Sequence, residues 1–148
     1  MKIMKALIQR VKNASVAIDG KLFSSIGQGM LVFLGVEKGD TTENADKLCD
    51  KVLNLRIFED ENEKMNLSLK DVKGDLLVVS QFTLCGDCKK GTRPSFDKAE
   101  LPQRANELYE YFVSQARKSQ LKVETGKFAA MMDVSLVNDG PVTFMVEK

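Results

Sequence analysis

The chain contains no histidine among its 148 residues. This absence excludes the Ser-His-Asp and Cys-His arrangements that activate a nucleophile, zinc sites with imidazole ligands, and any imidazole acid or base. Any reaction that this protein performs therefore depends on other groups.

Cysteines and long apolar runs are also scarce. The three cysteines, Cys49, Cys85 and Cys88, are an odd number and a poor disulfide framework, so we expect a reducing, cytoplasmic environment. No stretch approaches the roughly 20 apolar residues that span a bilayer. The first ten residues lack the apolar run and the cleavage site of a signal peptide. We therefore expect no membrane partner.

An excess of charge of either sign is absent as well. Lys plus Arg is 22 and Asp plus Glu is 21, giving a net charge of +1. This balance argues against a broadly basic surface for nucleic acid but leaves room for a local basic patch. The hydrophobic fraction of 43% and the length of 148 residues are typical of one globular domain, which we expect to span residues 1–148.

Hydrophobic patterning predicts strands at both ends of the chain. Asp19-Gly20 is a strong hairpin signal, and the continuous apolar run at 30–36 is typical of a strand buried on both faces. The segment Asn138-Asp139-Gly140-Pro141 reads as a β-turn between two strands. The predicted strands are residues 3–11, 14–18, 30–36, 76–84, 131–137 and 142–146.

Two helices are predicted between these groups of strands. The first is capped by Thr41 or Thr42, and the second begins near Pro102, a residue favoured in a first helical turn. Each has an apolar stripe at helical spacing. The stripes are Ala45, Leu48, Cys49, Val52 and Leu53, and Ala105, Leu108, Tyr109, Phe112, Val113 and Ala116. The expected fold class is α+β, with a curved sheet or small β-barrel packed by two helices.

The pair Cys85-Gly86-Asp87-Cys88 has three interpretations. Such a pair binds zinc or cycles between thiol and disulfide in some proteins. Zinc needs two further ligands, and only Cys49 remains as another cysteine. A redox pair usually opens a helix in a βαβ unit, whereas this pair enters a Lys-Lys-Gly loop. Incidental loop cysteines are the favoured interpretation.

Two other polar segments are ambiguous by themselves. Ser80-Gln81-Phe82-Thr83-Leu84 ends an apolar strand, where Ser80 and Thr83 either line a site or satisfy local backbone groups. A hydroxyl nucleophile there lacks an evident base. The basic loop at 89–96 is either a solvated loop, which is the commoner case, or a contact for phosphates.

In combination, the motifs resemble those of D-aminoacyl-tRNA deacylases, and the resemblance extends over essentially the whole chain. The pairing of Ser-Gln-Phe-Thr at 80–83 with Gly-Pro-Val-Thr at 140–143 is specific, although either motif alone is weak. The matching segments, in chain order, are residues 9–11, 54–60, 64–68, 80–84, 91–96 and 138–143.

The resemblance implies an enzyme that hydrolyses the ester between a D-amino acid, or glycine, and the 3′-terminal adenosine of tRNA. It implies a homodimer with active sites at the subunit interface, no cofactor, no metal and no DNA partner. In this family each subunit lends a Gly-cisPro loop, here Gly140-Pro141, to its partner's pocket, where it excludes L side chains. Arg10 matches the residue that braces this loop.

The same resemblance assigns the remaining site residues. Ser80, Gln81, Phe82 and Thr83 match the catalytic wall, and Phe128 with Met132 matches the adenosine side. We expect the N–H groups of Gln81 and Phe82 to hold the oxyanion, and the ribose 2′-hydroxyl to help activate water. We expect Thr83 to position rather than attack.

The sequence departs from the family pattern at two places. Cys85-Gly86-Asp87-Cys88 replaces a more usual Tyr-Ala-Asp, and Ala129 stands where glycine is usual. Two alternative functions stay open. One is the sister group that carries a trans Gly-Pro bond and edits certain L-aminoacyl-tRNAs. The other is a non-catalytic RNA-binding barrel, which usually shows exposed aromatics and a basic groove.

Overall fold

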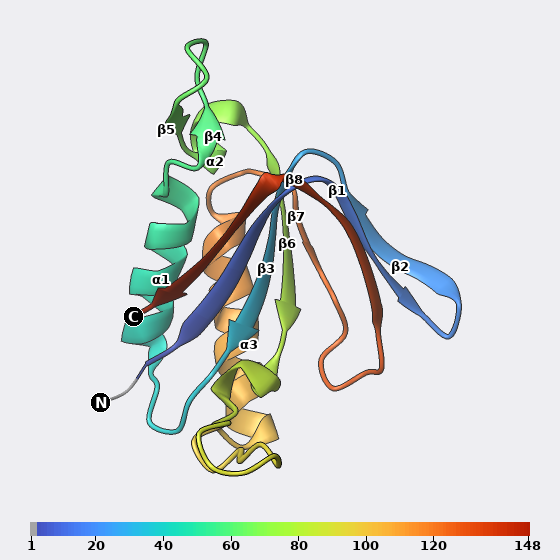
Figure 1. The fold of residues 1–148 in the computed structure, drawn as a ribbon, viewed down its shortest axis with the longest axis vertical. Helices are drawn as coiled ribbons and strands as arrows, with labels where there is room; N and C mark the ends of the chain where they lie inside the picture. The colour runs from blue at the N-terminus through green and yellow to red at the C-terminus, as the bar shows by residue number, and fades with distance from the viewer. Residues whose placement is uncertain (1–2) are drawn as a thin grey trace.

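The computed structural model describes residues 3–148 as a curved sheet with helices against one face (Figure 1). The expected α+β class is confirmed, and the sheet is barrel-like. The strands are β1 (Lys5–Ile18), β2 (Lys21–Ile26), β3 (Gly29–Gly35), β4 (Phe58–Glu59), β5 (Met65–Leu67), β6 (Asp75–Ser80), β7 (Val123–Thr125) and β8 (Asp133–Glu147). The helices are α1 (Thr42–Asn54), α2 (Leu69–Val72), the 3-10 helix η1 (Phe82–Cys85) and α3 (Pro102–Arg117).

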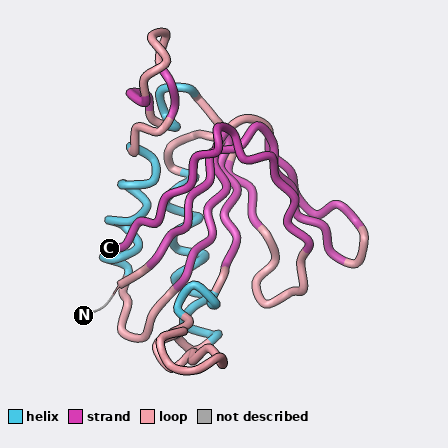
Figure 2. The backbone as a smooth tube through the Cα atoms, in the orientation of Figure 1, coloured by secondary structure: helices cyan, strands magenta, loops and turns pink. Residues whose placement is uncertain are grey.

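β1 organises the sheet because it pairs with three other strands. Its first half lies between β3 and β8, and its second half lies between β2 and β8, all antiparallel. β3, β6 and β7 continue the sheet in parallel. The Ser24 hydroxyl of β2 donates to the Thr125 carbonyl of β7 at 2.6 Å, so the curved sheet nearly closes on itself (Figure 2).

The hydrophobic residues form two cores, one on each side of the sheet. The larger core lies between the sheet and helices α1 and α3, and it contains both predicted apolar stripes in full. The smaller core lies within the curve of the sheet and includes Val11, Leu31 and Leu77. β3 is buried on both faces because each face meets one of these cores.

The predicted hairpin is confirmed. Asp19 and Gly20 have φ values of 53° and 77°, and β1 pairs with β2 up to Ile18 opposite Lys21. Two successive positive φ values are the geometry of a type I′ turn, whose twist matches that of the flanking strands. The two strands predicted at 3–11 and 14–18 form the single strand β1.

Three further predictions about secondary structure are wrong. The strand predicted at 76–84 ends at Ser80, and the chain then turns into η1. Two helices were expected, but α2 adds a third, which Ser68 caps through a bond from the Asp71 N–H at 3.2 Å. The strands predicted at 131–137 and 142–146 are one strand, β8.

The segment between those two expected strands is a bulge, not a turn. β1 advances two residues from Gln9 to Val11 while β8 advances five from Asn138 to Thr143. The extra length of β8 carries Gly140 and Pro141 out of the ladder while the pairing resumes on either side.

The Asn138 side chain joins the two ends of this bulge by hydrogen bonds. Its Oδ1 accepts the Val142 N–H at 3.1 Å, and its Nδ2 donates to the Thr143 hydroxyl at 3.0 Å. The side chain thus joins the start of the bulge to Val142 and Thr143, which follow Pro141. An amide side chain supplies both the acceptor for the Val142 N–H and the donor to the Thr143 hydroxyl.

We expect Asn138→Ala to open the bulge locally. Losing one hydrogen bond costs about 1 kcal/mol, so the Val142 amide proton should exchange roughly fivefold faster with solvent. Asn138→Asp is the matched control, because it keeps the acceptor for Val142 and the Thr143 hydroxyl can donate to it. Equal exchange rates in Asn138→Ala and the native protein would show that Asn138 does not hold the bulge.

Candidate active site

A cavity of about 760 Å³ opens where β6 ends, and it contains most of the predicted site residues. Its lining is mainly apolar and comes from β3, β6, η1, the start of α3 and the segment between β7 and β8. The predicted residues that it brings together are Ser80, Gln81, Phe82, Thr83, Phe128 and Met132.

The residues predicted to form the catalytic wall lie where β6 passes into η1. Leu34 of β3 pairs with Ser80, and the Leu34 carbonyl accepts the Gln81 N–H at 2.8 Å. The Gln81 N–H therefore extends the β3–β6 pairing and is not free for a ligand. This corrects the expectation that Gln81 donates its N–H to an oxyanion.

The free donors lie one residue further along the chain. The first bond of η1 runs from the Leu84 N–H to the Gln81 carbonyl at 3.2 Å. The N–H groups of Phe82 and Thr83 precede that bond, and a helix leaves its first N–H groups without intrahelical partners. These two N–H groups are the candidates for binding an oxyanion beside the cavity.

The Thr83 hydroxyl is held by a neighbour rather than activated by a base. The Gln81 side-chain amide donates to the Thr83 Oγ1. An amide donor leaves the hydroxyl oxygen less free to attack, and it takes up no proton. The arrangement orients both side chains on one wall of the cavity.

The segment between β7 and β8 also lines the cavity, and Gly126 within it and the buried Tyr109 pack against its lining residues. A Cβ placed on Gly126 would lie 2.6 Å from the Met132 sulfur, so Met132 packs closely against Gly126 and would have to shift if this glycine were replaced. The ring of Phe128 is tilted against that of Tyr109, with centroids 6.2 Å apart. The buried Tyr109 hydroxyl donates to the Val78 carbonyl at 2.6 Å, and burial raises the pKa of Tyr109 to about 12.

Ala129, which departs from the family pattern, has a left-handed backbone with φ of 64°. Glycine adopts this conformation without cost, whereas alanine pays roughly 1 kcal/mol or more. The side chain is exposed at the edge of the cavity. The backbone therefore keeps the conformation that glycine would favour.

The second part of the predicted site lies apart from the cavity. No residue of the β8 bulge and no atom of Arg10 is in the cavity lining. Figure 1 shows η1 at the bottom of the sheet and the bend of β1 and β8 at the top. Gly140 has φ of 126°, and its peptide bond with Pro141 is cis.

Arg10 fixes this bulge from inside. Its Nε donates to the Asp139 carbonyl at 3.1 Å, and its Nη1 donates to the Ile57 carbonyl at 2.8 Å. Its side chain is 7% exposed, and carboxylates of Asp139 and Glu59 lie 3.6 and 3.8 Å away. A Cβ on Gly140 would lie 3.0 Å from the Arg10 Nη2, so the bulge backbone lies close to the guanidinium.

Cys85 and Cys88 lie in different environments. Cys85 is buried, which raises its pKa to about 11, whereas Cys88 is exposed, and neither is in a disulfide. Within residues 3–148, no three His, Cys, Asp or Glu side chains are grouped so that they could hold a metal ion. A high thiol pKa makes Cys85 a poor nucleophile. The interpretation as loop cysteines stays a prediction.

Sequence reasoning missed several residues of the cavity. Phe96 and Leu101 lie at its edge with 40% and 66% exposure, and Met131 is 90% exposed. Phe96 belongs to segment 91–96, whose resemblance to the family pattern already pointed to a place near the site. No local pattern pointed to Leu101 or Met131, since folding alone brings them to the cavity. In the described part of the chain, no helix has the length and apolar character to cross a membrane.

Comparisons with known proteins identify the family of this chain. Residues 7–147 match the model of the family described as D-Tyr-tRNA(Tyr) deacylase. A D-aminoacyl-tRNA deacylase from Pseudoalteromonas translucida is 62% identical over 141 residues, 95% of this chain and 97% of that protein. The protein of that name from Aquifex aeolicus is 59% identical over 144 residues, 97% of each chain.

Two solved structures share the fold. A c-Myc DNA unwinding element binding protein superposes with a TM-score of 0.92 at 42% identity, over 97% of this chain and 98% of that chain. A probable eukaryotic D-amino acid tRNA deacylase superposes with a TM-score of 0.86 at 18% identity, over 99% of this chain and 100% of that chain. Because the family model matches residues 7–147 and the two relatives are about 60% identical, the chain belongs to the D-Tyr-tRNA(Tyr) deacylase family of hydrolases.

Proposed function

We propose that this chain hydrolyses the ester bond of D-aminoacyl-tRNA, releasing the D-amino acid and free tRNA. The observation that carries the proposal is the cavity at the end of β6, which Ser80–Thr83 line together with Phe128 and Met132 in a chain of this family. The apolar wall suits the terminal adenosine, and the start of η1 offers N–H groups to the ester. Aminoacyl-tRNA is present in the cytoplasm, where we expect the protein to act.

The chemistry requires little from side chains. Water adds to the ester carbonyl, and the resulting oxyanion accepts hydrogen bonds from the N–H groups of Phe82 and Thr83. The intermediate then expels the ribose 3′-oxygen, which takes a proton. One well-placed donor contributes about 10²–10³ in rate. An aminoacyl ester is already reactive, and the neighbouring ribose 2′-hydroxyl helps to activate the water, so no histidine is needed.

The β8 bulge supplies the chirality filter in this proposal. Gly140 and Pro141 are exposed and lie apart from the cavity of their own chain, which supports a homodimer in which each bulge enters the partner's cavity. Backbone carbonyls there meet an L side chain, whereas a D side chain points to open space. Arg10 and Asn138 hold the bulge on both sides, so these carbonyls cannot move away. Glycine has no side chain to reject.

The direct test is hydrolysis of matched D-, L- and glycyl-tRNAs by the purified protein. We expect rapid release of D-amino acids, measurable release of glycine and no release of L-amino acids above the background rate. Release is followed by acid precipitation of labelled aminoacyl-tRNA. Rapid hydrolysis of L-aminoacyl-tRNA would contradict the proposed selectivity, and no hydrolysis of any ester would favour a non-catalytic RNA-binding protein.

We expect Thr83→Ala to lower kcat by less than about tenfold, because the change removes one hydrogen bond and no nucleophile. Thr92→Ala, in the exposed loop after η1, is the matched control and should behave like the native protein. Single-turnover hydrolysis of D-aminoacyl-tRNA measures both. A complete loss of turnover in Thr83→Ala, with tRNA affinity and thermal stability preserved, would instead assign the attack to Thr83.

A further inference from the structure

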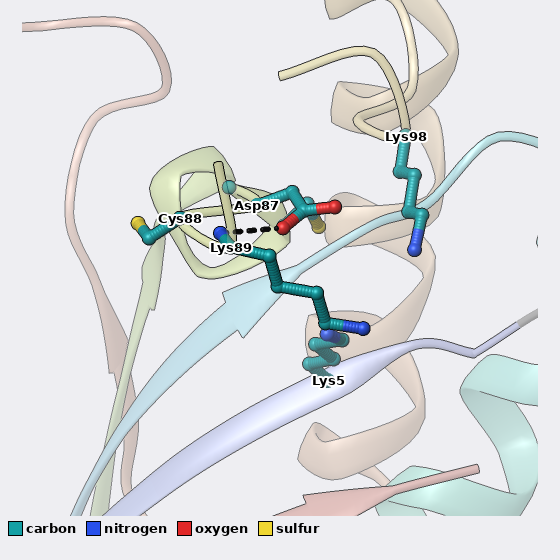
Figure 3. Close-up of a pocket in the computed structure, with 7 residues that line it drawn as sticks. Lys5, Asp87, Cys88, Lys89 and Lys98 are labelled. Atoms are coloured by element: carbon teal, nitrogen blue, oxygen red, sulfur yellow. Dashed lines mark hydrogen bonds between the residues drawn. The ribbon is translucent and has the colours of Figure 1, made fainter. Parts of the chain in front are cut away.

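A second concave site, which we call the lysine pocket, lies beside η1 and outside the cavity. Its volume is about 320 Å³, and it is lined by Lys5, Lys89, Lys98 and residues 85–88. Figure 3 shows that Lys5 comes from the start of β1, whereas Lys89 and Lys98 come from the loop between η1 and α3, and that the three side chains extend toward the same space. The sequence alone gave no reason to group them.

Of the three lysines in the lysine pocket, only Lys5 forms ion pairs with residues that the structure describes. Lys5 lies 3.5 Å from the Glu37 carboxylate and 3.9 Å from that of Glu147, which holds its ammonium group in place. The Asp87 carboxylate accepts the backbone N–H of Lys89 at 2.9 Å. Within residues 3–148, the ammonium groups of Lys89 and Lys98 form no ion pair. Two unpaired cations on one concave surface favour an anion between them.

An aromatic pair connects the lysine pocket with the cavity. Phe82 and Phe96 meet edge to face with centroids 5.1 Å apart, and both line the cavity. A Cβ on Gly86, which lines the lysine pocket, would lie 3.0 Å from the Phe96 ring. The two residues are 55% and 40% exposed, whereas phenylalanine is usually buried. Cavity, aromatic pair and lysine pocket are therefore adjacent.

We propose that this surface binds the single-stranded 3′ tail of the substrate RNA. Lys89 and Lys98, with Lys5, hold a backbone phosphate upstream of the terminal nucleotide, and the aromatic pair stacks a base of the same tail. Proteins that bind single-stranded nucleic acid combine cationic grooves with aromatic stacking in this way. The proposal rests on the proposed function, because it places the terminal nucleotide in the cavity.

The test compares two double variants with the same change in net charge. Lys89→Met with Lys98→Met removes the unpaired charges, and Lys21→Met with Lys118→Met removes two exposed lysines at other places in the fold. Affinity for uncharged tRNA is measured by fluorescence anisotropy at several salt concentrations. We expect the first variant to bind roughly tenfold more weakly, with a slope of log K against log salt reduced by about 0.7 to 1.4, and the control to change little.

A stacking variant and a short substrate complete the design. Phe96→Leu should bind tRNA about fivefold more weakly with an unchanged salt slope, because it loses stacking and no charge. D-aminoacyl-adenosine lacks the upstream phosphate, so the lysine double variant should hydrolyse it at the native rate while its KM for D-aminoacyl-tRNA rises.

Equal affinities and salt slopes in the two double variants would overturn the proposal. A native protein that binds tRNA through these lysines but hydrolyses neither substrate would instead overturn the proposed function. The binding and hydrolysis measurements thus separate the two failures.

Discussion

The buried guanidinium of Arg10 is the constraint on which the arrangement of this protein depends. It extends from the central strand β1 and donates to carbonyls on both sides, Ile57 after α1 and Asp139 in the β8 bulge. A buried charge is costly unless it is fully bonded, so the three segments must keep their relative positions. The same packing favours glycine at position 140, since a Cβ there would lie 3.0 Å from the Arg10 Nη2.

Local patterns predicted the parts of the fold that local chemistry decides. The stripes from Ala45 to Leu53 and from Ala105 to Ala116 match the buried faces of α1 and α3, because a helix repeats its environment every 3.6 residues. The segment 138–141 was misread because Asn, Asp, Gly and Pro suit a turn, whereas pairing with β1 keeps both flanks in one strand. That long-range pairing has no local signature.

In the candidate site, too, local patterns could be predicted and long-range contacts could not. The run Ser80–Thr83 was visible because its residue types are unusual at the end of an apolar strand. The bond from the Gln81 N–H to Leu34 was not, since it depends on how β3 pairs with β6. Likewise, Lys5 lies far along the chain from Lys89 and Lys98, so only folding brings the three lysines of the lysine pocket together. In our account, backbone donors, a fixed bulge and the RNA substrate itself replace the missing histidine.

The most direct test of the proposed selectivity is the ratio of kcat/KM for D- and L-aminoacyl-tRNA in Arg10→Lys. Lysine keeps the charge but cannot reach two carbonyls in a fixed plane, so the bulge loses its support. We expect at least a tenfold lower ratio of D to L hydrolysis in folded Arg10→Lys, while Arg93→Lys, in the exposed loop, keeps the native ratio. A native ratio in folded Arg10→Lys would contradict the claim that Arg10 and the bulge carry the selectivity.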